Sequence, residues 1–244
     1  LHYPLRRQRQ MCIRDRSQSV RLDAKARAAL DMTFSPPKSV SIQALVGKDP
    51  SVVAAHDAAV TKALAFIEQE LVRARQTEKG VTTMERSGNA AIAKFRHETA
   101  RPTDGAYSDP QLHTHALVLN ITQRADGSWT AISNDEIYRL VSLVQSVYSA
   151  ELVAELERAG HAIRYEGKSF ELAHVSREQI EAYSKRSQDI NAELASVGAT
   201  RLTASPKLKQ TIALKTRNNK APELTREELP VSYTHLTLPT KRIV

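Results

Sequence analysis

The chain has 244 residues, 41% of them hydrophobic, and no apolar run approaches the roughly 20 residues that cross a bilayer, so we expect no membrane association. Its single cysteine, Cys12, excludes an intramolecular disulfide and, with no secretory signal pattern, predicts a cytoplasmic protein. The formal charge of +8 does not argue for a nucleic-acid partner, because the two ends carry +4 and +2 and residues 17–230 only +2.

The two ends differ from the rest of the chain. Residues 1–16 and 231–244 have neither helical nor strand periodicity and resemble translated adapter or linker sequence. We therefore expect both to be non-native tails. Between them we expect one domain at residues 17–205, followed by a Lys-, Arg- and Asn-rich linker at residues 206–230.

The first predicted elements lie on both sides of the Pro36-Pro37 pair. An extended segment precedes it, and residues 39–44 alternate polar and apolar side chains, which is the pattern of a strand. Residues 50–75 have apolar side chains at helical spacing, and either Asp49 or Ser51 can cap this helix.

The middle of the chain is rich in strand patterns. Residues 80–99 predict a hairpin that turns at residues 87–89, where the sequence is Ser-Gly-Asn. A polar loop then leads into an apolar strand at residues 112–122. After an Asp-Gly turn, residues 128–133 predict a further short strand.

The rest of the domain mixes helices with a second hairpin. A long helix is predicted at residues 135–159, capped by Asn134 and ended by Gly160. Residues 161–173 predict a hairpin, and residues 176–196 an amphipathic helix. Strands mixed with long helices, without regular alternation of the two, predict an α+β fold in which helices cover an antiparallel sheet.

The stretch "QLHTHALVLN" carries two histidines one residue apart. On a helix, His113 and His115 would point about 200° apart around the axis and could not share a target. On a strand they share one face, with Cβ atoms roughly 6.5 to 7 Å apart. The apolar alternation that follows favours the strand, so the two imidazoles can converge on a single ion.

A third histidine is predicted to join this pair. In "AKFRHETAR", strand alternation puts His97 on the same face as Phe95, and the following loop returns directly to the His113 strand. Neighbouring strands lie about 5 Å apart, so His97 can lie beside the pair. Three neutral imidazoles leave a bound divalent ion its full charge, which suits a phosphate oxygen. The other histidines are interpreted as structural or as lying in the tails: His56 on a polar helix face, His161 and His174 beside helix ends or turns, and His2 and His235 in the tails.

Four motifs together resemble the relaxase domain of the MobF-type conjugative relaxases, in the HUH endonuclease superfamily: "DMTFSPPKSVSIQALVG", "KFRHETAR", "DPQLHTHALVLN" and "SNDEIYRL". The resemblance covers residues 31–214. It implies a palm-like sheet of about five antiparallel strands with flanking helices. It also implies metal-dependent nicking of single-stranded plasmid DNA at the origin of transfer, with conjugation accessory and coupling proteins as partners and a helicase domain following.

In this resemblance His97, His113 and His115 match the metal ligands, and Asp31 matches the acidic residue that opens the "TFS-x-PKS" motif. The implied cofactor is a divalent ion, Mg²⁺ or Mn²⁺, with Zn²⁺ as the alternative. A carboxylate at Asp31 can orient a histidine N–H or take a proton, and the sequence leaves both catalytic roles open.

Three basic residues are candidates for contact with DNA. Arg101 follows His97 by four positions, and its guanidinium can brace the scissile phosphate through two hydrogen bonds, so we assign it a catalytic and a DNA-binding role. Lys38 and Arg96 are weaker candidates for contact with the DNA backbone.

The nucleophilic tyrosine of the family is expected several tens of residues before Asp31, so we expect the chain to be a fragment that lacks it and is inactive alone. The tyrosines present lie in a tail or outside the motif, and burial is expected to account for the latter: Tyr3, Tyr107, Tyr138, Tyr148, Tyr165 and Tyr183. Two alternatives stay open: a noncatalytic single-stranded DNA-binding module, and an unrelated three-histidine metallohydrolase.

Overall fold

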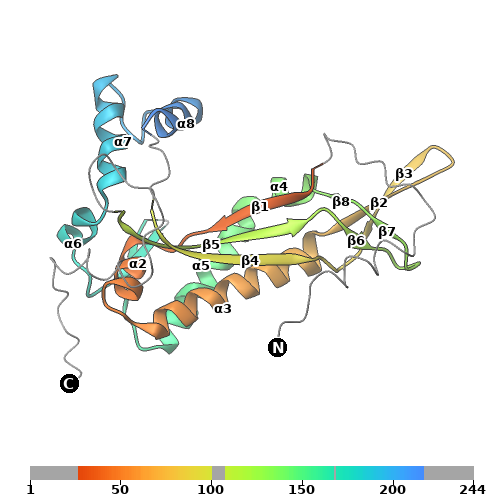
Figure 1. The fold of residues 1–244 in the computed structure, drawn as a ribbon, viewed down its shortest axis with the longest axis horizontal. Coiled ribbons are helices and arrows are strands. Elements are labelled where there is room, and N and C mark those ends of the chain that lie inside the picture. The colour runs from red at the N-terminus through yellow and green to blue at the C-terminus, as the bar shows by residue number, and fades with distance from the viewer. Residues whose placement is uncertain (1–26, 101–107, 168, 217–244) are drawn as a thin grey trace, which may run out of the picture.

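The computed structural model describes residues 27–100, 108–167 and 169–216. Its main sheet is antiparallel, with strand order β1-β5-β4 (Figure 1). These strands are β1 (Ala29–Phe34), β4 (Ile92–Thr99) and β5 (Pro110–Leu119). The predicted α+β class is confirmed. Within the described residues the main sheet has three strands, where about five were expected.

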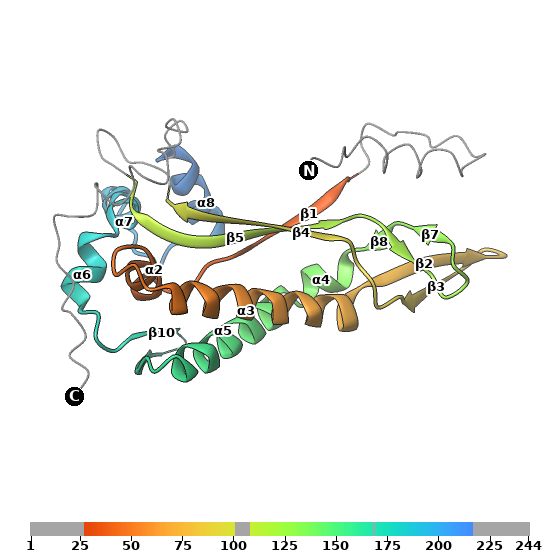
Figure 2. The same cartoon turned by 60° about the horizontal axis from the view of Figure 1, so that its bottom comes forward.

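Two long helices cover one face of this sheet. α3 (Pro50–Phe66) and α5 (Val141–Arg158) run side by side beneath the strands (Figure 2). Asp49 caps α3 as predicted, because its Oδ1 accepts a hydrogen bond from the Ser51 backbone N–H at 3.0 Å. The helices and strands enclose the main hydrophobic core, which includes Leu30, Met32, Phe34, Leu112, Ala116, Val60, Leu64 and Leu152.

The prediction of a strand at residues 39–44 is wrong, because these residues belong to helix α2 (Lys38–Leu45). The alternation has another cause: the helix is buried around most of its circumference, so its serines are buried along with its apolar side chains. Ser39 Oγ accepts a hydrogen bond from the Leu172 backbone N–H, and Ser41 Oγ accepts one from the Leu112 N–H. A buried serine that is satisfied in this way does not mark a solvent-facing side.

The helix predicted to extend to residue 75 ends earlier. α3 is followed by a π-helical turn, η1 (Ile67–Leu71), and then by strand β2 (Arg73–Glu78). β2 pairs with β3 (Val81–Arg86), and this hairpin turns at Lys79-Gly80, where Gly80 adopts a φ of 81° that favours glycine.

The hairpin predicted to turn at residues 87–89 is also wrong, because β3 and β4 lie in different sheets. Asn89, between these two strands, bonds to a distant residue, Gln123, instead of turning a hairpin. Its Oδ1 accepts a hydrogen bond from the Gln123 N–H, and its Nδ2 donates to the Gln123 carbonyl, each at 2.8 Å. β4 pairs with β5 instead of β3. This choice depends on contacts between residues that are far apart in the sequence.

The next part of the chain follows the predictions more closely. Short strands β6 (Thr122–Gln123) and β7 (Trp129–Thr130) pair with each other, and β8 (Ile132–Ser133) pairs with β2. The predicted helix at 135–159 is divided at Leu140 into α4 (Asp135–Arg139) and α5. The hairpin expected at 161–173 is confirmed as β9 (Ile163–Glu166) and β10 (Ser169–Leu172).

The last described helices lie beyond one end of the sheet (Figure 1). The helix predicted at 176–196 is two helices, α6 (Arg177–Ala182) and α7 (Lys185–Ser196). Residues 206–215, where we expected the linker to begin, form α8 (Pro206–Lys215). α7 and α8 share a small core of their own that contains Leu194, Ala204 and Ile212.

No helix in the described ranges is long and apolar enough to span a membrane. The tails expected at 1–16 and 231–244 lie outside the described residues.

Candidate metal centre and nucleic-acid cleft

β5 separates its side chains by strict alternation, as the sequence predicted. Leu112, Thr114, Ala116 and Val118 are buried against the helices, whereas the residues between them are partly exposed. His113 and His115 therefore lie on the face of the sheet that α3 and α5 do not cover.

The three predicted histidines come together on this open face. The register of β4 on β5 places His97 directly opposite His113. The three ring centroids are 5.3 Å apart in every pair, with His97 and His113 nearly parallel and His115 steeply inclined to both. The predicted convergence of three imidazoles from two neighbouring strands is therefore present.

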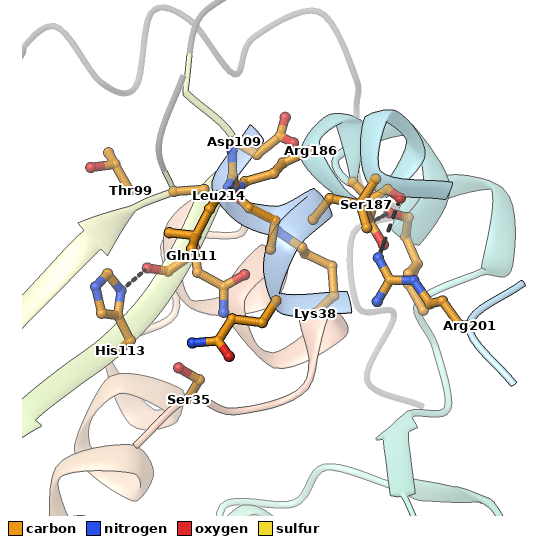
Figure 3. Close-up of a pocket in the computed structure, with 16 residues that line it drawn as sticks. Ser35, Lys38, Thr99, Asp109, Gln111, His113, Arg186, Ser187, Arg201 and Leu214 are labelled. Carbon is orange, nitrogen blue, oxygen red and sulfur yellow. Dashed lines mark hydrogen bonds between the residues drawn. The ribbon is translucent and has the colours of Figure 1, made fainter. Parts of the chain in front are cut away.

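Hydrogen bonds set the orientation of two of these rings. His113 Nδ1 lies 2.9 Å from the Gln111 carbonyl oxygen, to which it can only donate (Figure 3). His115 Nδ1 lies 3.0 and 3.1 Å from the two carboxylate oxygens of Asp31. With a proton on Nδ1, each ring keeps a lone pair on Nε2, the form in which histidine binds a metal.

The donor set fits a divalent ion in its chemistry: neutral imidazoles, with a carboxylate behind one of them. Burial lowers the pKa of His113, and the neighbouring His97 and His115 lower it further, which favours the neutral ligand form. As the side chains stand, no group of three His, Cys, Asp or Glu within the described residues has its donor atoms placed for coordination.

Asp31 reaches the site from the neighbouring strand β1. Its register partner on β5 is Leu117, so its carboxylate lies diagonally across from His115 and is about half exposed. Thr33 is directly opposite His115, with its Oγ1 3.3 Å from the same Nδ1. The structure thus brings Asp31 to the histidines, although 84 positions separate it from His115.

A hydrogen-bonded network lies on the other face of β5, beneath the histidines. His56 of α3 is fully buried, with Nε2 2.8 Å from Thr114 Oγ1 and Nδ1 2.8 Å from the Tyr148 hydroxyl. Burial lowers the pKa of His56 to about 4, so the ring is neutral at pH 7. Sequence reasoning assigned His56 to a polar helix face, and that is wrong; its spacing with buried Val52 and Ala59 was the available signal.

A cleft of about 840 Å³ opens beside the histidines, between the end of the sheet and helices α6, α7 and α8 (Figure 3). Its lining includes His113, Gln111 and Thr99 from the strands and Arg186 and Arg201 from the helical side. The cleft is therefore bounded by basic, neutral polar and apolar side chains and by one carboxylate, Asp109, and one of the candidate ligands lies at its edge.

Lys38 also lines this cleft, and its Nζ donates a hydrogen bond to the Pro110 carbonyl at 2.9 Å. Burial lowers the pKa of Lys38, while Asp109 and Glu171 oppose that effect. Arg96 points to the opposite face, where its guanidinium pairs with Asp57 of α3 at 2.5 Å, so the structure does not bring it to the histidines. Arg101 lies outside the described residues.

Only some of the tyrosines that we expected to be buried are buried in the structure. Tyr148 and Tyr183 are buried as expected, but Tyr138 is 50% exposed and Tyr165 69%. Tyr138 lines a smaller pocket of about 180 Å³ that Asp31 also lines. Tyr3 and Tyr107 lie outside the described residues.

The chain is similar to known conjugation proteins over most of its length. A family model described as TrwC relaxase matches residues 4–235. Two multifunctional conjugation proteins TraI are similar in sequence: one from Escherichia coli is 34% identical over 207 residues, and one from Escherichia coli strain K12 is 32% identical over 206. Each match covers 80% of this chain but only 11% of the TraI protein.

Solved structures of the conjugative relaxase TrwC are similar in fold. A metal-bound complex with oriT DNA has a TM-score of 0.80 and 44% identity, covering 89% of this chain and 73% of that one. A copper-bound complex has a TM-score of 0.82 and 39% identity, covering 96% and 80%. The match of the family model to nearly the whole chain, together with these likenesses, shows that the chain belongs to the TrwC relaxase family.

Proposed function

We propose that this chain is the relaxase domain of a conjugation protein and that it acts on single-stranded DNA at an origin of transfer. The observation that carries the proposal is the convergence of His97, His113 and His115 on the open face, with Asp31 behind His115 and, alongside, a cleft that has more basic than acidic lining residues. Relaxases of this family are DNA-nicking enzymes, and TrwC structures contain oriT DNA.

The three histidines would hold a divalent ion, Mg²⁺ or Mn²⁺ in our proposal, with Zn²⁺ as the alternative. Supporting this are the Nδ1 hydrogen bonds of His113 and His115, which leave Nε2 as the donor, and the metal-bound TrwC structures. Such an ion, when bound, supplies a positive charge that holds and polarises a phosphate oxygen.

In this proposal, side chains of the protein orient the metal ligands and bind the DNA backbone. Asp31 holds the His115 ring through Nδ1, and we propose this positioning as its role. Lys38, Arg186 and Arg201 line the cleft, where a phosphodiester backbone can pass. In the nicking reaction a tyrosine gives up its hydroxyl proton and its oxygen forms the bond to phosphorus. The bond from phosphorus to the 3′ oxygen of the preceding nucleotide breaks, and that oxygen takes up a proton. The tyrosine is expected before Asp31. Arg101 stays a candidate for bracing the phosphate.

The single-stranded DNA-binding alternative shares all of these contacts and differs only in lacking the chemical step. We further propose that the chain works in the cytoplasm, where plasmid DNA is found, together with conjugation accessory and coupling proteins. The family match weakens the second alternative, an unrelated three-histidine metallohydrolase.

The first test is metal binding, measured by titration calorimetry with Mn²⁺. We expect one ion per chain in the wild type, none in His113→Ala, and about 10- to 100-fold weaker binding in Asp31→Ala, which loses only the group that orients a ligand. His174→Ala is the matched control, because this histidine bonds to Gln43 away from the site and should bind Mn²⁺ as the wild type does.

The same proteins are then mixed with a labelled 27-mer of the kind in the TrwC complex, which contains the recognition hairpin and the cleavage site. Binding to this DNA is followed by fluorescence anisotropy with Mn²⁺ or EDTA. Failure of the wild type to bind either the ion or the DNA would refute the proposed function.

A further inference from the structure

An exposed aromatic ring lies next to the histidines. Phe95, in the middle of strand β4, is 50% exposed, although phenylalanine is among the residues most often buried. Its register partner on β5 is His115, and it precedes His97 by two positions on the same face. Phe95 therefore flanks two of the three candidate ligands at once.

The open face has a definite order along the strands. The cleft residues Thr99 and Gln111 lie at one end, the His97–His113 pair comes next, and the Phe95–His115 pair follows on the side away from the cleft. Successive side chains on one face of a strand are about 6.5 to 7 Å apart. A nucleotide spans a similar distance, so a strand that leaves the cleft and crosses the histidines would place its next base over Phe95.

About half of Phe95 is open to solvent, so no element in the described part of the chain covers the whole ring. The helices α3 and α5 lie under the opposite face, and α7 and α8 lie at the cleft end of β4 and β5 (Figure 2). The neighbouring charged residues of β4 point away, since Lys94 donates to Thr61 and Arg96 pairs with Asp57, both on α3. The ring is a flat apolar surface of about the size of one base.

We propose that Phe95 is a stacking platform for the unpaired base next to the scissile phosphate, on the side of that phosphate opposite the cleft. The inference rests on the proposed function, because the histidines place the phosphate. A base has a π-face whatever its identity, so the platform holds and orients the strand without reading its sequence. Fixing this base limits rotation of the adjoining phosphodiester, which makes Phe95 a positioning residue for cleavage.

The test uses the hairpin-containing 27-mer with 5-iodouracil substituted at one position at a time on each side of the cleavage site. Irradiated 5-iodouracil forms a covalent crosslink to an aromatic ring on which it stacks, and mass spectrometry of the digested protein identifies the crosslinked residue. We expect one position, on one side of the cleavage site only, to crosslink to Phe95. Phe95→Tyr should keep the crosslink, and Phe95→Leu should lose it.

Affinity for the unmodified 27-mer provides a second measurement. Phe95→Leu keeps an apolar side chain but no ring, and should bind about 5- to 100-fold more weakly than the wild type, as expected for loss of one stacked base. Phe95→Tyr should bind like the wild type. Leu119→Ala is the control, because Leu119 is 41% exposed on the same face but farther from the histidines, and it should change neither affinity nor crosslinking.

The outcomes separate the two proposals. A wild type that binds the 27-mer but crosslinks elsewhere, or a Phe95→Leu protein with unchanged affinity, would overturn the stacking inference and leave the proposed function standing. A Phe95→Leu protein with wild-type affinity and a lower melting temperature would show that protein covers the ring. A wild type that binds no DNA would overturn both.

Discussion

Individual hydrogen bonds give histidines of this protein two different roles. His113 and His115 direct Nδ1 toward a carbonyl and a carboxylate, which leaves Nε2 toward the open face. His56, beneath them, uses both nitrogens inside the protein, bonded to Thr114 and Tyr148. Thr114 lies between the two histidines in sequence, so this buried network holds the strand that carries them.

The buried His56 should make stability depend on pH. Its folded pKa is about 4, below the ordinary 6.5, because burial disfavours the charged ring; Asp57 opposes this, whereas Arg96 and His113 add to it. Between those values the unfolded chain binds a proton that the folded chain does not, so stability falls as pH falls from 6.5 to 4. At pH 4.5 the loss attributable to His56 should be about 2 to 3 kcal/mol relative to pH 7.5.

Urea unfolding of the wild type and His56→Gln at these two pH values measures the effect. The wild type should lose more stability than the variant, since glutamine does not titrate. Equal losses in the two proteins would show that His56 is not the group responsible.

Helix α2 links the strand of the histidines to the rest of the domain. It packs against both β5 and β10, and its two buried serines each accept a backbone N–H from one of those strands: Ser41 from Leu112 at 3.1 Å and Ser39 from Leu172 at 2.7 Å. Leu112 immediately precedes His113. A hydroxyl on α2 therefore completes the hydrogen bonding of the backbone at the start of the site.

Removing one of these hydroxyls should be costly. Ser41→Ala leaves the buried Leu112 N–H without its acceptor and should lower the free energy of unfolding by about 1 to 3 kcal/mol. Ser146→Ala is the control, since this exposed serine of α5 bonds only within its own helix and should change stability by less than about 0.5 kcal/mol. The comparison is made by urea unfolding, and similar values for the two variants would contradict the role given to Ser41.

The distribution of charge over the whole domain matters more than its sum. Residues 17–230 carry only +2, yet Lys38, Arg186 and Arg201 all line the cleft next to the histidines, against one acidic lining residue, Asp109. The cleft is made by two parts with separate cores, the sheet with its helices and the α7–α8 unit. Attraction for a nucleic acid is thus local, produced where these parts meet.

Affinity for single-stranded DNA should therefore fall steeply with salt. Each phosphate neutralised on a single strand contributes about −0.7 to the slope of log affinity against log salt concentration. The three basic residues of the cleft therefore predict a slope of about −2. Arg201→Ala should reduce the slope by about 0.7. Arg177→Ala, at an exposed ion pair on α6 outside the cleft lining, should not change it. Anisotropy titrations over a range of salt concentrations test this, and a flat response or equal affinity for duplex DNA would count against the cleft.

Local patterns were enough for the parts of the site that lie on single strands. Alternation along residues 112–122 identified β5 and put His113 and His115 on one face, and the short connection back from His97 correctly paired its strand with β5. The β9–β10 hairpin was equally visible. These features depend on neighbours within a few residues, which is the range over which periodicity and turn chemistry act.

Other features required partners from distant parts of the chain. The alternation of α2 predicts a strand, because the sequence does not show that its serines are buried and accept hydrogen bonds from the Leu112 and Leu172 N–H groups. The burial of His56 likewise depends on its hydrogen bonds to Thr114 and Tyr148. No local pattern placed Asp31 behind His115; only the family resemblance suggested it. The reason is physical: periodicity records which side of an element is apolar, whereas the choice of a hydrogen-bond partner depends on which elements pack together.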